Sequence, residues 1–114
     1  MHKKGRDFDL WIEENLYGSE IIPEIEAYVD NGIAPMVPCY SSWHGTVSWL
    51  LVDLARVDKL RINLFLSGGH WNCEIFYNRV RSVGIHLEIQ MAVCLAIANA
   101  VDNGLRIPER GQDE

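Results

Sequence analysis

The chain has 114 residues, of which 48% are hydrophobic and 23% are charged. This length fits a single domain, and this composition excludes a wholly disordered chain. The formal net charge is −6, from 10 Lys and Arg against 16 Asp and Glu. An acidic balance argues against binding of long nucleic acid, because such binding depends on a basic face.

The charge is unevenly distributed along the chain. Residues 1–54 carry 3 basic and 9 acidic side chains, whereas residues 56–81 carry 5 basic and 2 acidic ones. The middle of the chain is therefore a modestly basic segment, which suits a small anionic ligand better than a long polyanion.

The cysteines are odd in number, widely spaced and without a CxxC pair, which predicts no disulfide framework and favours a reducing compartment. No apolar run reaches the roughly 18–20 residues of a membrane span, and no signal peptide is visible. We therefore expect a soluble protein in the cytoplasm that makes no contact with membranes. The cysteines are Cys39, Cys73 and Cys94.

The first predicted element is a helix over residues 7–18, because apolar side chains recur there every four residues. Asp7 would cap its start and Gly18 would close its end, while Glu13 and Glu14 would face water. The apolar positions are Phe8, Ile12 and Leu16.

Residues 19–38 predict a short irregular segment that ends at Pro35 and Pro38. Residues 41–57 then give the clearest helical pattern in the chain, with Ser41 or Ser42 as its N-cap. Its apolar stripe consists of Trp43, Val47, Leu50, Leu51, Leu54 and Val57.

Residues 60–77 alternate with period two around Gly68 and Gly69, which predicts a β-hairpin. A third strand is expected over residues 83–89, followed by an alanine-rich helix that Gly104 closes. Phe65 and Phe76 point away from the main apolar faces of the hairpin, so we expect the second face of the sheet to be covered as well.

This order of elements predicts an α+β fold, a small three-layer α-β-α sandwich in which helices cover an antiparallel β-hairpin or sheet. Residues 1–105 would form one domain and residues 106–114 a polar C-terminal tail.

Three blocks of sequence resemble the phage ABA sandwich domain family, small proteins of bacteriophages and prophages. They are "DLWIEENLYG", "VPCYSSWHGTVSWLLVDL", and "GGHWNCEIFY" followed by "MAVCLAIANAV". The chain departs from the family pattern at Ser42-Trp43 and Ser48-Trp49, and residues 19–34 have no counterpart. The resemblance implies an α-β-α sandwich and a phage or prophage origin, and it transfers no catalytic residue.

Metal binding and catalysis find little support in the spacing of the reactive side chains. The histidines and cysteines lack the spacings of zinc sites, so we predict no metal and no cofactor. Cys73 and His70 would point to opposite faces of a strand, and Cys39 is only near His44 in sequence. Gly68 and Gly69 fit a hairpin turn better than a phosphate cradle. We therefore predict a protein that is not an enzyme.

Aromatic and basic side chains around the hairpin and at a helix N-terminus would suit a nucleotide, since rings stack on bases and guanidinium groups bind phosphate. The alternative is that the aromatic residues are core and the arginines only solubilise. The predicted ligand-binding residues are Tyr40, Trp43, His44, Arg61, His70, Trp71, Tyr77, Arg79 and Arg81.

Two functions follow as hypotheses. The first is a phage counter-defence protein that binds and withholds a nucleotide-type signal of the bacterial host in the cytoplasm of the infected cell. The second is a protein–protein interaction module that forms a homo-oligomer or docks on a host protein, through exposed apolar residues such as Trp49, Leu87 or Met91 or through a sheet edge.

Overall fold

The computed structural model describes residues 2–18 and 37–107, so the predicted irregular segment lies outside the described residues except for its last two. None of the helices in these ranges is long and apolar enough to cross a membrane. In chain order the elements are α1 (Arg6–Asn15), α3 (Thr46–Leu54), β1 (Arg61–Ser67), β2 (His70–Tyr77), β3 (Val80–His86) and α4 (Ile89–Asp102).

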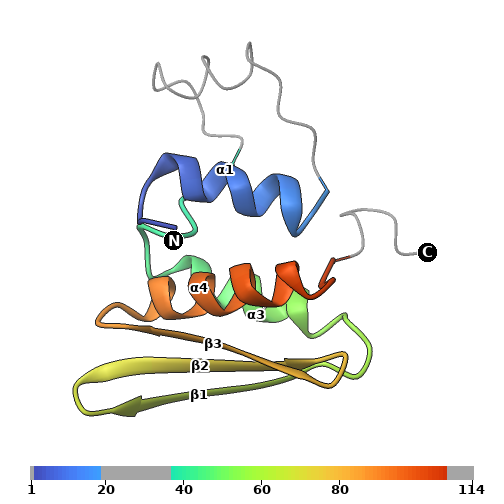
Figure 1. Cartoon of the computed structure of the whole chain (residues 1–114). Helices are drawn as coiled ribbons and strands as arrows, with labels where there is room; N and C mark the ends of the chain where they lie inside the picture. Colours follow the sequence, from blue (N-terminus) through green and yellow to red (C-terminus); the bar gives the residue numbers. More distant parts are fainter. Residues whose placement is uncertain (1, 19–36, 108–114) are drawn as a thin grey trace.

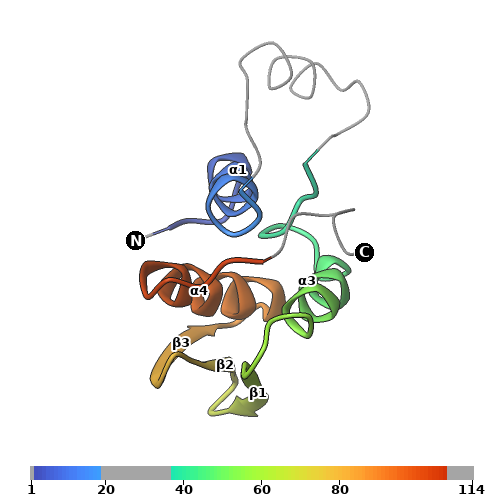
Figure 2. The ribbon, with the colours of Figure 1, turned by 90° about the vertical axis from the view of Figure 1, so that its right-hand side faces the viewer.

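The elements form three layers (Figures 1 and 2). Helix α1 is the outer layer, α4 and α3 lie side by side in the middle, and the sheet forms the other outer layer. The α+β class, with an antiparallel sheet covered by helices, is confirmed. Within the described residues these helices all lie on one face of the sheet, so the layers run helix, helix, sheet.

The sheet is an antiparallel meander in the order β1-β2-β3. Gly68 and Gly69 have φ values of 61° and 81° and make the two-residue turn between β1 and β2, as predicted. Asn78 and Arg79, with φ values of 54° and 64°, make the second turn. Because this turn is equally tight, the third strand begins at Val80, three residues earlier than expected.

Helix α4 forms the centre of the molecule. It lies between the sheet and α1, and ten of its side chains are buried. It approaches β3 at Gly84, where an added Cβ would lie 2.5 Å from the backbone nitrogen of Ala96 and would also clash with the carbonyl oxygen of Ala92. The absence of a side chain at Gly84 therefore sets how closely the helix packs on the sheet.

The two faces of the sheet differ in cover. On the helix-facing face, Cys73 and Ile75 are fully buried. The other face, here called the open face, carries no helix within the described residues, and Phe65 on it is 43% exposed. The expectation that Phe65 and Phe76 signal a covered second face is therefore not met in this part of the chain.

Helix α3 is shorter than the helix predicted over residues 41–57. Ser41 does not cap it; the Ser41 hydroxyl instead donates to Asp9 Oδ1 at 2.7 Å and accepts from the Gly5 N–H at 2.9 Å. The Thr46 hydroxyl bonds the carbonyl oxygens of Tyr40 and Trp43 at 3.0 and 2.8 Å. These bonds hold residues 39–45 in turns, so the helix begins only at Thr46.

Helix α1 also differs in detail from its prediction. It begins at Arg6 with Gly5, not Asp7, at the N-cap. Glu13 is buried rather than facing water, since its Oε1 accepts a hydrogen bond from the Tyr40 hydroxyl at 2.7 Å. Gly18 has the left-handed φ of 74° expected of a helix-closing glycine.

Replacement of Gly84 tests the close contact between α4 and β3. Gly84→Ala should lower the free energy of unfolding by about 2–3 kcal/mol, because the helix backbone must move away from the strand. Thermal unfolding should show a midpoint lowered by roughly 10 °C. Ser82→Ala, on the same face of β3, is the matched control and should change the midpoint little. A Gly84→Ala midpoint equal to that of the wild type would contradict the close packing.

Candidate functional site

The nine predicted ligand-binding residues do not converge on one place. The structure distributes them over the core under α1, the start of α3, the open face of the sheet, the first hairpin turn and the second turn.

Tyr40 belongs to the core. Its side chain is fully buried, its ring stacks on that of Tyr17 with the centroids 6.0 Å apart, and its hydroxyl donates to Glu13. A ligand could reach this ring only if α1 moved away, so the interpretation of Tyr40 as a core residue fits the structure.

Arg61 and Arg81 are the two predicted residues that the sheet brings together. Both lie opposite Phe76 in one cross-strand row. The Arg61 guanidinium lies 4.4 Å from the centroid of the Phe76 ring, a cation–π contact. Arg81 forms an ion pair with Glu74, to which its Nε donates at 2.8 Å. This hydrogen bond lowers the pKa of Glu74, so much of the charge of Arg81 is already matched.

The remaining hairpin residues lie at the two ends of the strands. His70 is exposed on the open face beside the first turn, whereas Trp71 is half-buried on the helix-facing face. Tyr77 and Arg79 lie at the second turn, at the opposite end of β2. His70 and Cys73 therefore point to opposite faces, as the alternation predicts.

Trp43 and His44 are exposed just before α3. Trp43 packs against Trp49, which is not among the nine predicted residues. Trp43 and Trp49 are each 50% exposed and meet edge to face, with ring centroids 5.8 Å apart. The Trp43 ring also covers Gly45, where an added Cβ would lie 2.6 Å from it. Both rings are thus held in defined positions at the protein surface.

Beside Trp49 lies a shallow groove of about 430 Å³, here called the tryptophan groove. Val52, which is 66% exposed, forms part of it, and Asp53 is the one charged residue in its lining. The Asp53 carboxylate is fixed by the Tyr17 hydroxyl, which donates to it at 2.5 Å. The lining consists of Pro38, Ser48, Trp49, Val52 and Asp53.

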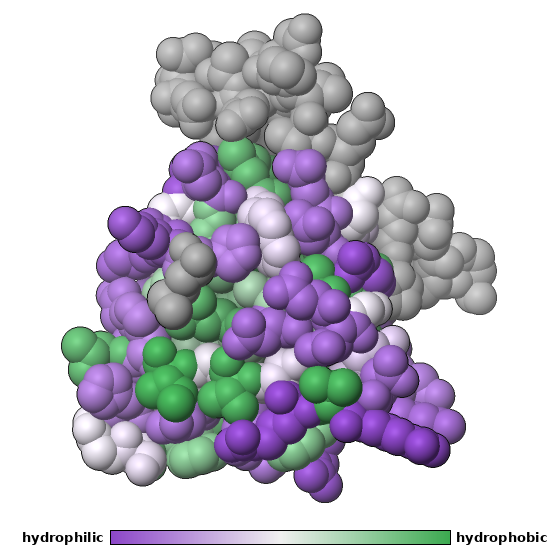
Figure 3. All heavy atoms as spheres, viewed as in Figure 1, coloured by the Kyte–Doolittle hydropathy of each residue, from purple (hydrophilic) through white to green (hydrophobic). Residues whose placement is uncertain are grey.

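A second hollow, of about 740 Å³, runs along the boundary of α4 and β3. Figure 3 shows hydrophobic side chains gathered over α4 and the sheet, below the mostly polar side chains over α1. Two of its polar side chains are already used within the fold: the Asn99 amide donates to the Val83 carbonyl at 2.7 Å, and His86 Nδ1 accepts from the Glu88 N–H at 2.9 Å. They therefore offer little to a polar ligand.

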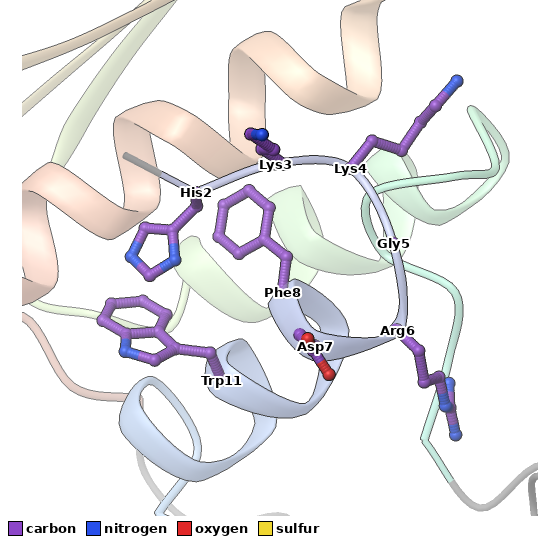
Figure 4. Close-up of a pocket in the computed structure, with 8 residues that line it drawn as sticks. All are labelled: His2, Lys3, Lys4, Gly5, Arg6, Asp7, Phe8 and Trp11. Atoms are coloured by element: carbon purple, nitrogen blue, oxygen red, sulfur yellow. The ribbon is translucent and has the colours of Figure 1, made fainter.

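A third hollow, of about 480 Å³, lies at the start of α1. In Figure 4 the His2 ring faces the rings of Phe8 and Trp11, with centroids 4.6 and 4.3 Å away. Burial lowers the pKa of His2, which favours a neutral ring that completes an aromatic cluster. No sequence pattern predicts this cluster, because His2 lies outside every predicted element.

Two of the three cysteine thiols are buried. Burial raises the pKa of Cys73 to about 12 and also raises that of Cys94, so both stay protonated at neutral pH. Cys39 is exposed. Within the described ranges, no three side chains among His, Cys, Asp and Glu are grouped so that they could hold a metal ion.

A buried network of hydrogen bonds holds the segment before α3 against α1. It thereby positions the tryptophan groove. Asp9 Oδ1 accepts from both the backbone N–H and the hydroxyl of Ser41, at 2.8 and 2.7 Å. Arg6 donates to the Val37 carbonyl at 2.9 Å and lies 3.9 Å from Asp9 Oδ2. Burial raises the pKa of Asp9, although its bonds to Ser41 and the charge of Arg6 oppose this shift.

Comparison of the chain with protein-family models, with curated proteins and with solved structures finds no match. The resemblance to the phage ABA sandwich family therefore stays a prediction from the sequence.

Two substitutions test the role of Asp9 as the acceptor in this hydrogen-bond network. Asp9→Ala leaves the buried Ser41 N–H without its acceptor and should cost about 3 kcal/mol in unfolding free energy. Asp9→Asn keeps an acceptor oxygen and should stay within about 1 kcal/mol of the wild type at neutral pH. Urea unfolding of the three proteins measures both values. Equal losses in the two variants would contradict this role of the acceptor.

Comparison of the wild type with Asp9→Asn also tests how the stability depends on pH. Because the pKa of Asp9 in the folded protein lies above its ordinary value of 3.8, the folded state holds its proton longer than the unfolded state. The Asp9 contribution to stability should therefore fall as the pH rises from about 4 through the raised pKa. The difference in unfolding free energy between wild type and Asp9→Asn, measured over this range, should show that fall. A difference that does not vary with pH would contradict it.

Proposed function

We propose that the protein is a non-enzymatic binding protein that docks on another protein through the tryptophan groove. The observation that carries this proposal is the pair of half-exposed tryptophans, Trp43 and Trp49, held edge to face beside a preformed apolar groove. The phage resemblance adds the proposal that it is an accessory protein, acting on a host protein in the cytoplasm of an infected bacterial cell.

The exposure of these side chains is costly unless a partner covers them. Tryptophan is among the residues that contribute most to protein interfaces, because burial of its large ring stabilises a complex by several kcal/mol. Trp43 is further fixed by its contact with Gly45, so that little side-chain entropy is lost on binding. An isolated apolar side chain on a surface needs no explanation, but a cluster of this kind indicates an interaction site.

The lining of the groove also indicates the chemistry of the partner. Trp49, Val52 and Pro38 offer apolar contacts, and Asp53 places one negative charge at the groove. The Tyr17 hydroxyl fixes the direction of that carboxylate. We therefore expect the partner to insert an apolar segment that carries a lysine or arginine next to its apolar residues.

The absence of an enzymatic function belongs to the same proposal. It is supported by the protonated, buried thiols of Cys73 and Cys94 and by the dispersal of the predicted ligand-binding residues over separate places. Neither the hollow at His2 nor the hollow beside β3 has a serine, threonine or cysteine in its lining that could act as a nucleophile.

A nucleotide-type ligand is a second candidate, favoured by the row of Arg61, Phe76 and Arg81 on the open face. A base could stack on this row while Arg61 binds phosphate. Isothermal titration with cyclic and ADP-ribose-type nucleotides tests it: binding that Arg61→Ala abolishes would support this candidate. The absence of heat with all of these nucleotides would remove it.

Substitution of Trp49 tests the docking proposal. A photo-crosslinking residue at Ser48, which lines the groove, first identifies the partner in bacterial cells. With the purified pair, Trp49→Ala should raise the Kd about 30-fold, equivalent to the roughly 2 kcal/mol of an interface hot spot. Trp43→Ala should have a similar effect. Titration calorimetry provides the measurement.

Two control variants sharpen this experiment. Leu87→Ala removes an exposed apolar side chain outside the groove and should leave the Kd unchanged. Asp53→Asn keeps an acceptor for Tyr17 but removes the charge, so it should weaken binding several-fold and reduce its salt dependence. The proposal fails if Leu87→Ala weakens binding as much as Trp49→Ala, or if neither tryptophan variant changes the Kd.

A further inference from the structure

The two edges of the sheet are not equivalent. On β3 the carbonyl oxygen of Val83 accepts a hydrogen bond from the Asn99 side chain of α4, so part of this edge is occupied from within the chain. Strand β1 is the other edge. Within the described ranges, no backbone hydrogen bond reaches it from outside its pairing with β2.

The sequence of β1 lacks the features that protect an exposed edge. Its seven residues contain no proline and one charged residue, Arg61, at the first position. Leu66, near its end, is 60% exposed. Natural sheets usually protect an edge with inward charges, proline, a bulge or a covering segment. Figure 2 shows α3 above the sheet rather than beside β1 in its plane.

The hairpin geometry fixes which groups β1 presents. Ser67 and His70 close the two-residue turn, and the residues of such a closing pair bond each other through their main chains. Alternation along the strand then directs the N–H and C=O groups of Leu66, Leu64 and Ile62 outward. The side chains of these three residues share the helix-facing face.

We infer that β1 pairs antiparallel with β1 of a second copy, about a two-fold axis at Leu64, to form a continuous six-stranded sheet. In this register Leu64 lies opposite the partner's Leu64, and Ile62 lies opposite the partner's Leu66. Apolar side chains therefore meet apolar side chains along the helix-facing face.

The charges are compatible with this pairing. Arg61 lies opposite the partner's Ser67, so no like charges face each other directly. The two Arg61 side chains are six residues apart along the strands, or about 20 Å, well beyond the Debye length of about 8 Å at physiological salt. A second copy thus satisfies the main-chain groups and the apolar row without electrostatic cost.

The oligomeric state and the edge can be tested together. Analytical ultracentrifugation of the wild type over a dilution series should show a monomer–dimer equilibrium. Leu66→Lys, which places a charge in the apolar row, should shift the chain to monomer. Ile85→Lys is the matched control, since Ile85 is similarly exposed (54%) on the β3 edge strand, and it should leave the dimer intact. A wild type that is monomeric at every concentration, or a dimer that survives Leu66→Lys, overturns the inference.

Two further measurements do not depend on the stability of that variant. The backbone amide of Leu64 should exchange with deuterium more slowly as protein concentration rises, while the amides of β3 stay unchanged. In a Cys39→Ser/Cys73→Ala background, which removes the cysteine opposite Leu64 in β2, Leu64→Cys should form an intermolecular disulfide on oxidation, because opposed residues in an antiparallel pair lie about 5 Å apart. Leu66→Cys, far from its own copy in this register, should not. Concentration-independent exchange, or cross-linking at Leu66 alone, overturns the register.

This inference is independent of the docking proposal. The double variant Trp43→Ala/Trp49→Ala should remain a dimer, although it loses its partner. If the double variant becomes monomeric, the groove rather than β1 holds two copies together, and the β1 inference is overturned.

Discussion

The close contact between α4 and β3 at Gly84 is the constraint on which the arrangement of this protein depends. Because Gly84 has no side chain, the backbone of α4 lies directly on the strand, and the helix is buried from both sides. Helix α4 thereby lies over β3 and β2, with α3 beside it toward β1, as Figure 2 shows. The same helix supplies Asn99 to the β3 edge. The exposed face of α3 and the free edge of β1 are thus the surfaces that α4 does not reach.

The hydrogen-bond network of Asp9, Ser41 and Gly5 positions the tryptophan groove. It joins the start of α1 to the turns before α3. Two more hydrogen bonds support this arrangement: Tyr40 donates to Glu13 of α1, and Tyr17, just after α1, donates to Asp53 of α3. These links are buried or partly buried, so their loss would leave polar groups without partners. A groove held in this way is largely preformed, which reduces the entropy lost when a partner binds.

Much of the fold follows from local sequence patterns. The hairpin around Gly68-Gly69 and the alanine-rich helix were predictable, because strand alternation and the tight-turn glycines act within a few residues. The start of α3 was not, since Ser41 is bound by Asp9, 32 residues away, instead of capping a helix. For the same reason Glu13 was expected in water, whereas the structure places it against Tyr40.

The candidate site was less predictable than the fold. Periodicity assigned Trp43 to the apolar stripe of a helix, but the turn before Thr46 carries it to the surface beside Trp49. Of the apolar residues expected at an interface, Trp49 and Leu87 are exposed, while Met91 is buried because α4 is covered on both sides. Sequence spacing identifies which residues are apolar, but the layer order decides which of them remain exposed.

The four tryptophans provide a direct test of the central claim that binding occurs at the tryptophan groove. Their indole N–H signals can be followed separately by ¹⁵N NMR while the purified partner is added. If the partner binds at the tryptophan groove, the signals of Trp43 and Trp49 should shift, and that of Trp11, in the cluster with His2, should stay in place. Shifts of Trp11 or Trp71, with those of Trp43 and Trp49 unchanged, would contradict it.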